Sequence, residues 1–190
     1  MIPFSNDIEQ CLTILNSGGL ILYPTDTIWG IGCDATNAEA VAKIYSLKER
    51  ATNKNMIILL ADEKDILTYV TQPDLQIFDY IKGISKPVTV IYEGATGLAD
   101  NLVSDDGTIA IRLVSDPFCR HLVKRFRKPL VSTSANVSGY PPPAIYTDID
   151  AAIKNGVDYI VQHRQDDLFT GVPSAIIRWN KNGIPTIIRN

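Results

Sequence analysis

Hydrophobic residues along the chain occur in short dense runs and at helical spacing, and the two patterns alternate as in an α/β protein. Runs rich in apolar and β-branched residues, typical of strands, cover residues 20–22, 56–60, 88–92, 108–114 and 130–131. Helical spacing predicts helices over residues 7–17, 36–50, 62–70, 73–83, 117–126 and 148–155. Residues 157–161 alternate as a strand, and residues 174–179 and 184–189 flank Asn180-Lys181-Asn182-Gly183, a hairpin signal. We therefore expect one α/β domain over residues 1–190, with a twisted mixed parallel and antiparallel sheet and flanking helices.

Several predicted helices begin or end at residues that favour helix termini. Asp7 is a candidate cap of the first helix, and Thr36 forms a capping box with Glu39 before the second. Asp116-Pro117 matches an N-cap followed by proline at the first helical position. Gly156 is expected just beyond the helix over 148–155.

Small polar side chains gather where two of the predicted strands end. Thr25-Asp26-Thr27 follows the first strand, and Ser132-Thr133-Ser134-Ala135-Asn136 continues a later one. Gly30 and Gly32 follow the first cluster, where the backbone can approach a ligand closely. Ligands of open α/β sheets bind at the carboxyl ends of strands. The alternative is a pair of ordinary turns, because these residue types also bond to nearby backbone.

Basic residues cluster at two predicted helix ends. Lys48, Arg50 and Lys54 lie within seven residues, either as helix-end cations favoured by the dipole or as an anion site. The stretch 124–128 carries four cations and is either a solvated helix end or an RNA contact. Arg112 shares a face of the strand 108–114 with Thr108, a setting in which an arginine usually marks an edge or a solvent-facing position.

Composition excludes several classes of protein. Hydrophobic residues make up 45% of the 190 residues and charged residues 21%, as in globular proteins. The net charge of −3 and the pI of about 5.3 do not indicate a general attraction to nucleic acid. No apolar run is long enough for a membrane span, and the first residues lack the features of a signal peptide. We therefore expect a cytoplasmic protein without a membrane partner.

Common catalytic and metal-binding patterns are also missing. Cys11, Cys33 and Cys119 lie far apart, which suits free thiols in a reducing compartment and offers no zinc spacing. The usual phosphate-binding glycine motifs and the serine-hydrolase elbow do not occur. Only two histidines are present, neither in a recognisable catalytic context.

Four motifs, taken together, resemble the YrdC-like family of threonylcarbamoyl-AMP synthases. They are Pro24-Thr25-Asp26-Thr27 with Gly30-x-Gly32, Lys48-x-Arg50, Ser134-Ala135-Asn136 with Ser138-Gly139, and Gly171-Val172-x-Ser174. Each motif is weak alone, but their order and spacing match the short single-domain form of the family over nearly the whole chain.

The resemblance implies a fold with a large concave cavity and a nucleotidyltransferase activity. Family members convert ATP, L-threonine and bicarbonate into threonylcarbamoyl-AMP and pyrophosphate, with Mg²⁺ accompanying ATP. The intermediate then passes to the tRNA threonylcarbamoyl-transfer machinery. Binding of tRNA or double-stranded RNA is a further expectation from the family.

The resemblance also assigns roles to residues that match the family motifs. Lys48 and Arg50 are the expected catalytic cations. The expected contacts of L-threonine are Thr27, Arg112, Ser132 and Ser174. The expected contacts of ATP are Arg50, Lys54, Thr108, Ser134, Asn136 and Arg189. No protein ligand of a metal ion is expected.

This sequence also departs from the family pattern. Asp26 stands where many members have Glu, Leu59 where some have His, Pro142 where a serine contacts ATP, and Ala175 where Thr is common. The extra C-terminal domain of longer members is not expected, because the chain ends at Asn190. Two alternatives therefore stay open: a non-catalytic RNA-binding translation or ribosome-maturation factor, and a YciO-like paralogue that acts on a related acyl adenylate.

Overall fold

The chain folds around one twisted mixed sheet with helices on both faces. The computed structural model describes residues 3–49, 56–168, 170–179 and 184–190. Within these ranges the strands are β1 Ile21–Tyr23, β2 Gly30–Gly32, β3 Ile57–Leu60, β4 Val88–Glu93, β5 Thr108–Leu113, β6 Leu130–Ser134, β7 Tyr159–Ile160, β8 Ala175–Trp179 and β9 Pro185–Arg189. The helices are α1 Ser5–Asn16, α2 Ala38–Leu47, α3 Ile66–Tyr69, α4 Gln76–Lys82, α5 Pro117–Phe126 and α6 Ala151–Asn155, with short 3-10 turns η1 Glu63–Asp65 and η2 Tyr146–Asp148.

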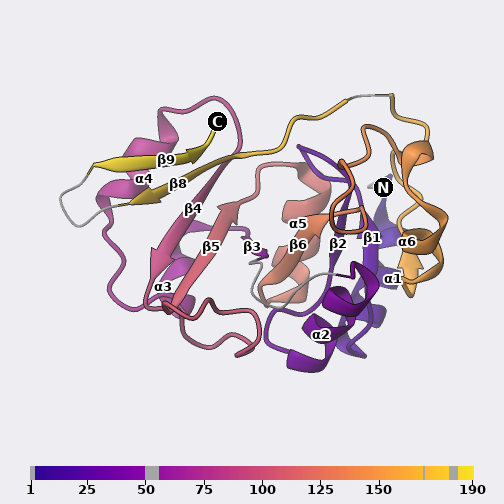
Figure 1. The fold of residues 1–190 in the computed structure, drawn as a ribbon, viewed down its shortest axis with the longest axis horizontal. Coiled ribbons are helices and arrows are strands. Elements are labelled where there is room, and N and C mark those ends of the chain that lie inside the picture. The colour runs from indigo at the N-terminus through magenta and orange to yellow at the C-terminus, as the bar shows by residue number, and fades with distance from the viewer. Residues whose placement is uncertain (1–2, 50–55, 169, 180–183) are drawn as a thin grey trace.

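The strand order is β7-β1-β2-β6-β3-β5-β4-β8-β9 (Figure 1). Pairs β1–β7, β3–β5 and β4–β8 are parallel, whereas the other neighbours are antiparallel. The mixed sheet predicted from the sequence is therefore confirmed. The hairpin of β8 and β9 forms one end of the sheet, and its predicted turn lies outside the described residues.

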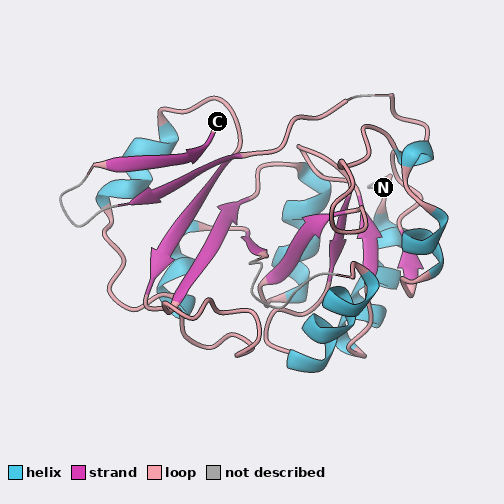
Figure 2. Cartoon of the chain, viewed as in Figure 1, coloured by secondary structure: helices cyan, strands magenta, loops and turns pink. Residues whose placement is uncertain are grey.

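Two hydrophobic clusters cover the two faces of the sheet. Along β3, Ile58 and Leu60 enter a cluster with α2, α3 and α4, while Leu59 enters a second cluster with α1 and α5. Because both faces are covered (Figure 2), this central strand is apolar throughout rather than alternating. None of the described helices is long and apolar enough to cross a membrane.

The structure corrects three of the predicted helix ends: the start of α1 and both ends of α2. Asp7 does not cap α1: it lies inside the first turn, and its carboxylate accepts hydrogen bonds from the Tyr159 hydroxyl and from the backbone of residues 162 and 163. Asn37, not Thr36, caps α2, because Thr36 bonds to Asp34 instead. That helix ends at residue 47 rather than 50.

The N-terminus of α5 agrees with the sequence. Asp116 accepts a hydrogen bond from the backbone N–H of Cys119 at 2.9 Å, with Pro117 at the first helical position. This helix packs against α1 under the loop that carries Thr25-Asp26-Thr27. The cap therefore helps to fix the helix beneath a predicted site.

Candidate active site

A cavity of about 360 Å³ lies where β5, β6 and the β8–β9 hairpin approach the loop between β1 and β2. It brings together residues separated by up to 162 positions in the chain, since Thr27 and Arg189 both line it. Six of the residues predicted from the sequence line this cavity: Thr27, Arg112, Ser132, Ser134, Ser174 and Arg189. These six are most of the polar residues that line the cavity.

The contacts of the loop after β1 determine which of its two threonine hydroxyls donates to the other. The Thr25 hydroxyl donates to the carbonyl of Ile28 at 2.8 Å and accepts from the backbone N–H of Thr27 at 3.0 Å. The two threonine hydroxyls are 2.8 Å apart, so the proton between them comes from Thr27. As a result, Thr27 Oγ1 faces the cavity as an acceptor only.

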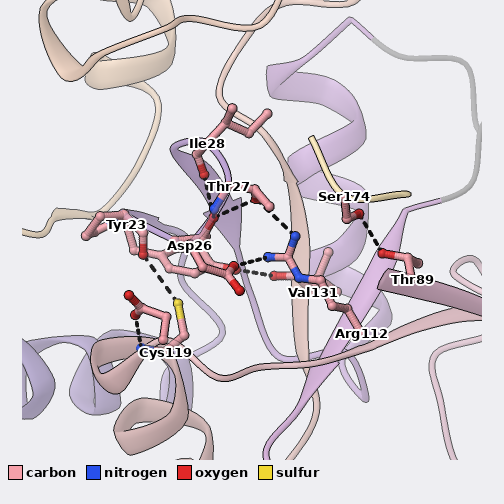
Figure 3. A network of polar contacts seen from close by, with 12 residues as sticks. Tyr23, Asp26, Thr27, Ile28, Thr89, Arg112, Cys119, Val131 and Ser174 are labelled. Atoms are coloured by element: carbon pink, nitrogen blue, oxygen red, sulfur yellow. Dashed lines mark hydrogen bonds and ion pairs between the residues drawn. The ribbon is translucent and has the colours of Figure 1, made fainter. Parts of the chain in front are cut away.

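Arg112 is a buried cation beside that acceptor (Figure 3). Its Nη1 donates to Thr27 Oγ1 at 3.0 Å, and its Nη2 lies 3.4 Å from Asp26 Oδ1. The side chain is 3% exposed, and its Nε has no hydrogen-bond partner among the described residues. A buried guanidinium with an unused donor next to a cavity favours an anionic ligand.

The position of Arg112 follows from strand register. It lies on β5 between Leu59 of β3 and Thr89 of β4, all on one face of the sheet. The usual expectation for an arginine in a strand, an edge or solvent-facing position, is therefore wrong here. The reason is that β5 is an interior strand and Asp26 and Thr27 come from another segment to meet the guanidinium.

The opposite side of the cavity is formed by the C-terminal hairpin. The Ser174 hydroxyl lies 2.8 Å from that of Thr89, and Arg189 donates to the Ser174 carbonyl through Nε at 3.2 Å and Nη2 at 2.8 Å. Burial, together with the positive charge of Arg112, lowers the pKa of Arg189 from its usual value. Two guanidinium groups therefore repel one another across the cavity, and a bound anion would relieve this repulsion.

Three other predicted residues, Lys48, Thr108 and Asn136, do not line the cavity. The Lys48 amine is buried and donates to the carbonyls of Ser134 and Asn136. The Asn136 amide donates to the carbonyls of Val137 and Tyr140 at 2.9 and 2.7 Å. These contacts fix the backbone just beyond β6, which presents Ser134 to the cavity.

Thr108 lies at the far end of β5 from Arg112. Its hydroxyl donates to Asp106 Oδ1 at 2.6 Å. Arg50 and Lys54 lie outside the described residues. The roles predicted for these residues as contacts of ATP stay predictions.

Sequence reasoning missed most of the apolar surface of the cavity. Trp29, Met56, Pro173 and Ile176 line it, and the rings of Trp29 and Tyr146 lie 5.0 Å apart. Pro142, noted only as a departure from the family, also lines it. Trp29 lies between Thr27 and Gly30 of the first motif, and this position could have indicated that it lines the site. Ile176 lines the site only because β8 pairs with β4, which no local pattern predicts.

The three cysteines are buried, and none of them is placed to act as a nucleophile in the cavity. Cys119 is buried and donates to the carbonyl of Pro24 at 3.3 Å, and burial raises its pKa well above the usual value. Burial likewise raises the pKa of Cys11 to about 12 and that of Cys33 further. These shifts favour the thiol over the thiolate, and none of the three cysteines lines the cavity.

The described residues contain no group of three or more His, Cys, Asp or Glu side chains arranged to hold a metal ion. The charge that faces the cavity is positive, from Arg112 and Arg189, with Asp26 beside the first of them. This surface suits carboxylate and phosphate groups of ligands.

Comparison with known proteins identifies the family of this chain. The family model Sua5/YciO/YrdC, described as "Telomere recombination", matches residues 13–190. A threonylcarbamoyl-AMP synthase of Photobacterium profundum is 30% identical over 160 residues, which are 83% of this chain and 86% of that protein. One from Coxiella burnetii is 29% identical over 188 residues, covering 94% of this chain and all of that protein.

Solved structures share the fold. P. abyssi Sua5 complexed with L-threonine superposes with a TM-score of 0.84 at 20% identity over 96% of this chain, which spans about half (53%) of the Sua5 chain. E. coli YciO superposes with a TM-score of 0.83 at 22% identity, covering 97% of this chain and 89% of YciO. The chain therefore belongs to the Sua5/YciO/YrdC family.

Proposed function

We propose that this protein is an L-threonylcarbamoyladenylate synthase, a nucleotidyltransferase that uses ATP, L-threonine and bicarbonate. The observation that carries the proposal is the buried guanidinium of Arg112, held beside Thr27 in a cavity that also contains Arg189. Relatives named for this activity cover most of the chain, and a Sua5 structure with this fold was solved with L-threonine.

The Arg112 side of the cavity suits the amino acid. Arg112 lines the cavity and its guanidinium can donate to the carboxylate, and charge-assisted pairing favours arginine for this task. Thr27 Oγ1 can only accept, so it suits the amino or hydroxyl group of L-threonine. Ser132 and Ser174 lie on the same cavity as further contacts of the amino acid.

The reaction needs positioning more than a protein nucleophile. The amino group of L-threonine attacks the carbon of bicarbonate and water leaves, which gives a carbamate. A carbamate oxygen then attacks the α-phosphorus of ATP, and pyrophosphate leaves with the electron pair of the broken P–O bond. Fixed cations lower the barrier by neutralising the charge that develops on the phosphates.

ATP is assigned to the Ser134 and Arg189 side of the cavity. Lys48, Arg50, Lys54, Thr108 and Asn136 remain proposed contributors to ATP binding or to the order of the neighbouring backbone. We propose that Mg²⁺ arrives with ATP and is held mainly by phosphate oxygens and water. We further propose that the product passes to the tRNA threonylcarbamoyl-transfer machinery in the cytoplasm, a reducing compartment that suits three free cysteines.

The experiment is a pyrophosphate assay with purified protein, ATP, Mg²⁺, L-threonine and bicarbonate. We expect pyrophosphate release that requires both L-threonine and bicarbonate, together with formation of the adenylate. L-Serine and L-valine serve as matched amino acids that lack the methyl or the hydroxyl group. Release of orthophosphate alone, indifferent to L-threonine, would contradict the synthase and favour a YciO-like activity.

The RNA-binding alternative gains no support from the basic stretch after residue 123. Lys124 pairs with Asp62 at 3.2 Å, Arg125 with Glu9 at 2.5 Å, and Lys128 with Asp34 at 2.6 Å. Three of the four cations in the stretch therefore have carboxylate partners, which reduces the charge available to phosphate groups of RNA.

A further inference from the structure

The loop that carries Asp26 and Thr27 is attached to the protein on the side away from the cavity. Its internal hydrogen bonds use the hydroxyl of Thr25, whereas the carbonyls of Pro24 and Thr25 receive donors from other segments. Cys119 Sγ donates to the first at 3.3 Å, and Arg164 Nη1 donates to the second at 3.1 Å. Arg164 does not line the cavity.

Arg164 connects this loop to α5. Its Nη1 also lies 3.3 Å from Asp116 Oδ2, and its Nε lies 2.9 Å from Asp167 Oδ2. The other oxygen of Asp116 caps α5, so one carboxylate fixes both the helix end and the arginine. The guanidinium is mostly shielded from solvent, with 23% of the side chain exposed.

The backbone of Arg164 has a conformation that is uncommon for a residue other than glycine. Its φ is +68°, in the left-handed region that a non-glycine residue adopts at a cost. A conformation of this kind persists when surrounding contacts hold it. Here those contacts are the two carboxylates and the Thr25 carbonyl.

We infer that Arg164 is a positioning residue for L-threonine binding, an inference that rests on the proposed function. The connection runs from Arg164 to the Thr25 carbonyl, through the paired hydroxyls of Thr25 and Thr27, to Nη1 of Arg112. Loss of Arg164 releases the Thr25 backbone and moves Thr27 Oγ1 relative to Arg112. Ser134 and Arg189 belong to β6 and β9, so the ATP side keeps its geometry.

The test compares Arg164→Ala and Arg164→Lys with the wild type in the pyrophosphate assay. Arg125→Ala is the matched control, because Arg125 also forms a guanidinium–carboxylate pair, with Glu9 on α1, but does not touch the loop. We expect Arg164→Ala to raise the KM for L-threonine about tenfold and to leave the KM for ATP within about twofold. Arg164→Lys restores most of the affinity for L-threonine, since an ammonium donates to the same carbonyl, and Arg125→Ala changes neither constant.

Arg164→Gly guards against a variant that fails to fold. Glycine adopts the left-handed backbone without strain while it removes the same side chain, so the same rise in KM is expected. An unchanged KM for L-threonine in a folded Arg164→Ala or Arg164→Gly variant, or equal rises for both substrates, would overturn the inference.

Calorimetric titration with L-threonine separates this inference from the proposed function. If the wild type binds L-threonine but releases no pyrophosphate, the proposed synthase activity fails, and weaker binding by the Arg164 variants still supports the positioning role. If the wild type is active and the Arg164 variants bind L-threonine normally, the positioning role alone fails. Absence of L-threonine binding to the wild type would overturn both.

Discussion

The fork of the Arg112 guanidinium is the residue feature with the sharpest consequence for activity. One nitrogen bonds to Thr27, a second approaches Asp26, and Nε is unused among the described contacts. A lysine at this position offers one compact charge and cannot satisfy Thr27 and a carboxylate in the same plane. We expect Arg112→Lys to raise the KM for L-threonine about tenfold or more, with a much smaller effect on the KM for ATP.

Steady-state pyrophosphate release with each substrate varied in turn measures this difference. A melting curve of the variant controls for a loss of folded protein. Equal changes in both Michaelis constants would remove Arg112 from the recognition of the amino acid.

Lys48 makes structural contacts that the sequence did not predict. The sequence placed it with Arg50 and Lys54 as a phosphate cradle, but its amine bonds to the carbonyls of Ser134 and Asn136. Removal of the amine leaves the Asn136 carbonyl without this donor, at about 1–3 kcal/mol, whereas the Ser134 carbonyl keeps the backbone N–H of Asn136 at 2.9 Å. We therefore expect Lys48→Met to lower the free energy of unfolding by about 1–3 kcal/mol.

Lys43→Met is the matched control for this prediction. Lys43 lies on α2, which ends just before Lys48, and donates to the carbonyl of Gly18 at 2.8 Å, but it is exposed. Its loss is expected to cost less than about 0.5 kcal/mol. Urea denaturation of both variants gives the comparison, and equal losses would show that the Lys48 contacts are not structural.

At the scale of elements, the segment leading into β8 depends on the absence of a side chain at Gly171. A Cβ at this position would overlap the carbonyl oxygen of Thr27, which is backbone and cannot rotate away. Gly171→Ala must therefore push apart the segment that carries Ser174 and the loop that carries Thr27. We expect kcat/KM for L-threonine to fall about 100-fold, as displacements near 1 Å do in positioned sites.

Gly83→Ala controls for the general effect of adding a methyl group. A Cβ at Gly83 would meet its nearest atom, the carbonyl oxygen of Tyr80, at an ordinary 3.5 Å. This variant should keep full activity in the same assay. A fully active Gly171→Ala variant would mean that the two segments separate without consequence for the site.

Elements with local signals were predictable, and their long-range partners were not. The α5 cap was predicted because Asp116 and Pro117 act within one turn. Asp7 was assigned to the wrong role because its partners lie more than 150 residues away, where no local pattern reports them. The contacts of Lys48 were not predicted for the same reason, because its acceptor carbonyls are 86 and 88 residues distant.

For the whole molecule, the mixed sheet and the family were predicted, whereas the assembly of the cavity was not derivable from periodicity. Arg112 meets Ser174 and Arg189 because β8 pairs with β4 in parallel and β9 then pairs with β8. The order of strands in the sheet cannot be predicted from the spacing of hydrophobic residues along the chain. Only the resemblance of the motifs assigned these residues to one site.

The strand order also decides when a newly made chain can become active. Strand β1 can pair with β7 only after residues 159–160 have been made, and β4 can pair with β8 only after residues 175–179 have been made. A ribosome that has reached residue 170 has already delivered Thr27, Arg112 and Ser134, but neither Ser174 nor Arg189. Until then the edge of β4 has no partner on that side, and such pairings between distant segments form slowly and expose edges to misassembly. The cavity is therefore complete only after residues 174–189 have been made, and a chain stopped before β8 would lack Ser174 and Arg189 and leave the edge of β4 unpaired.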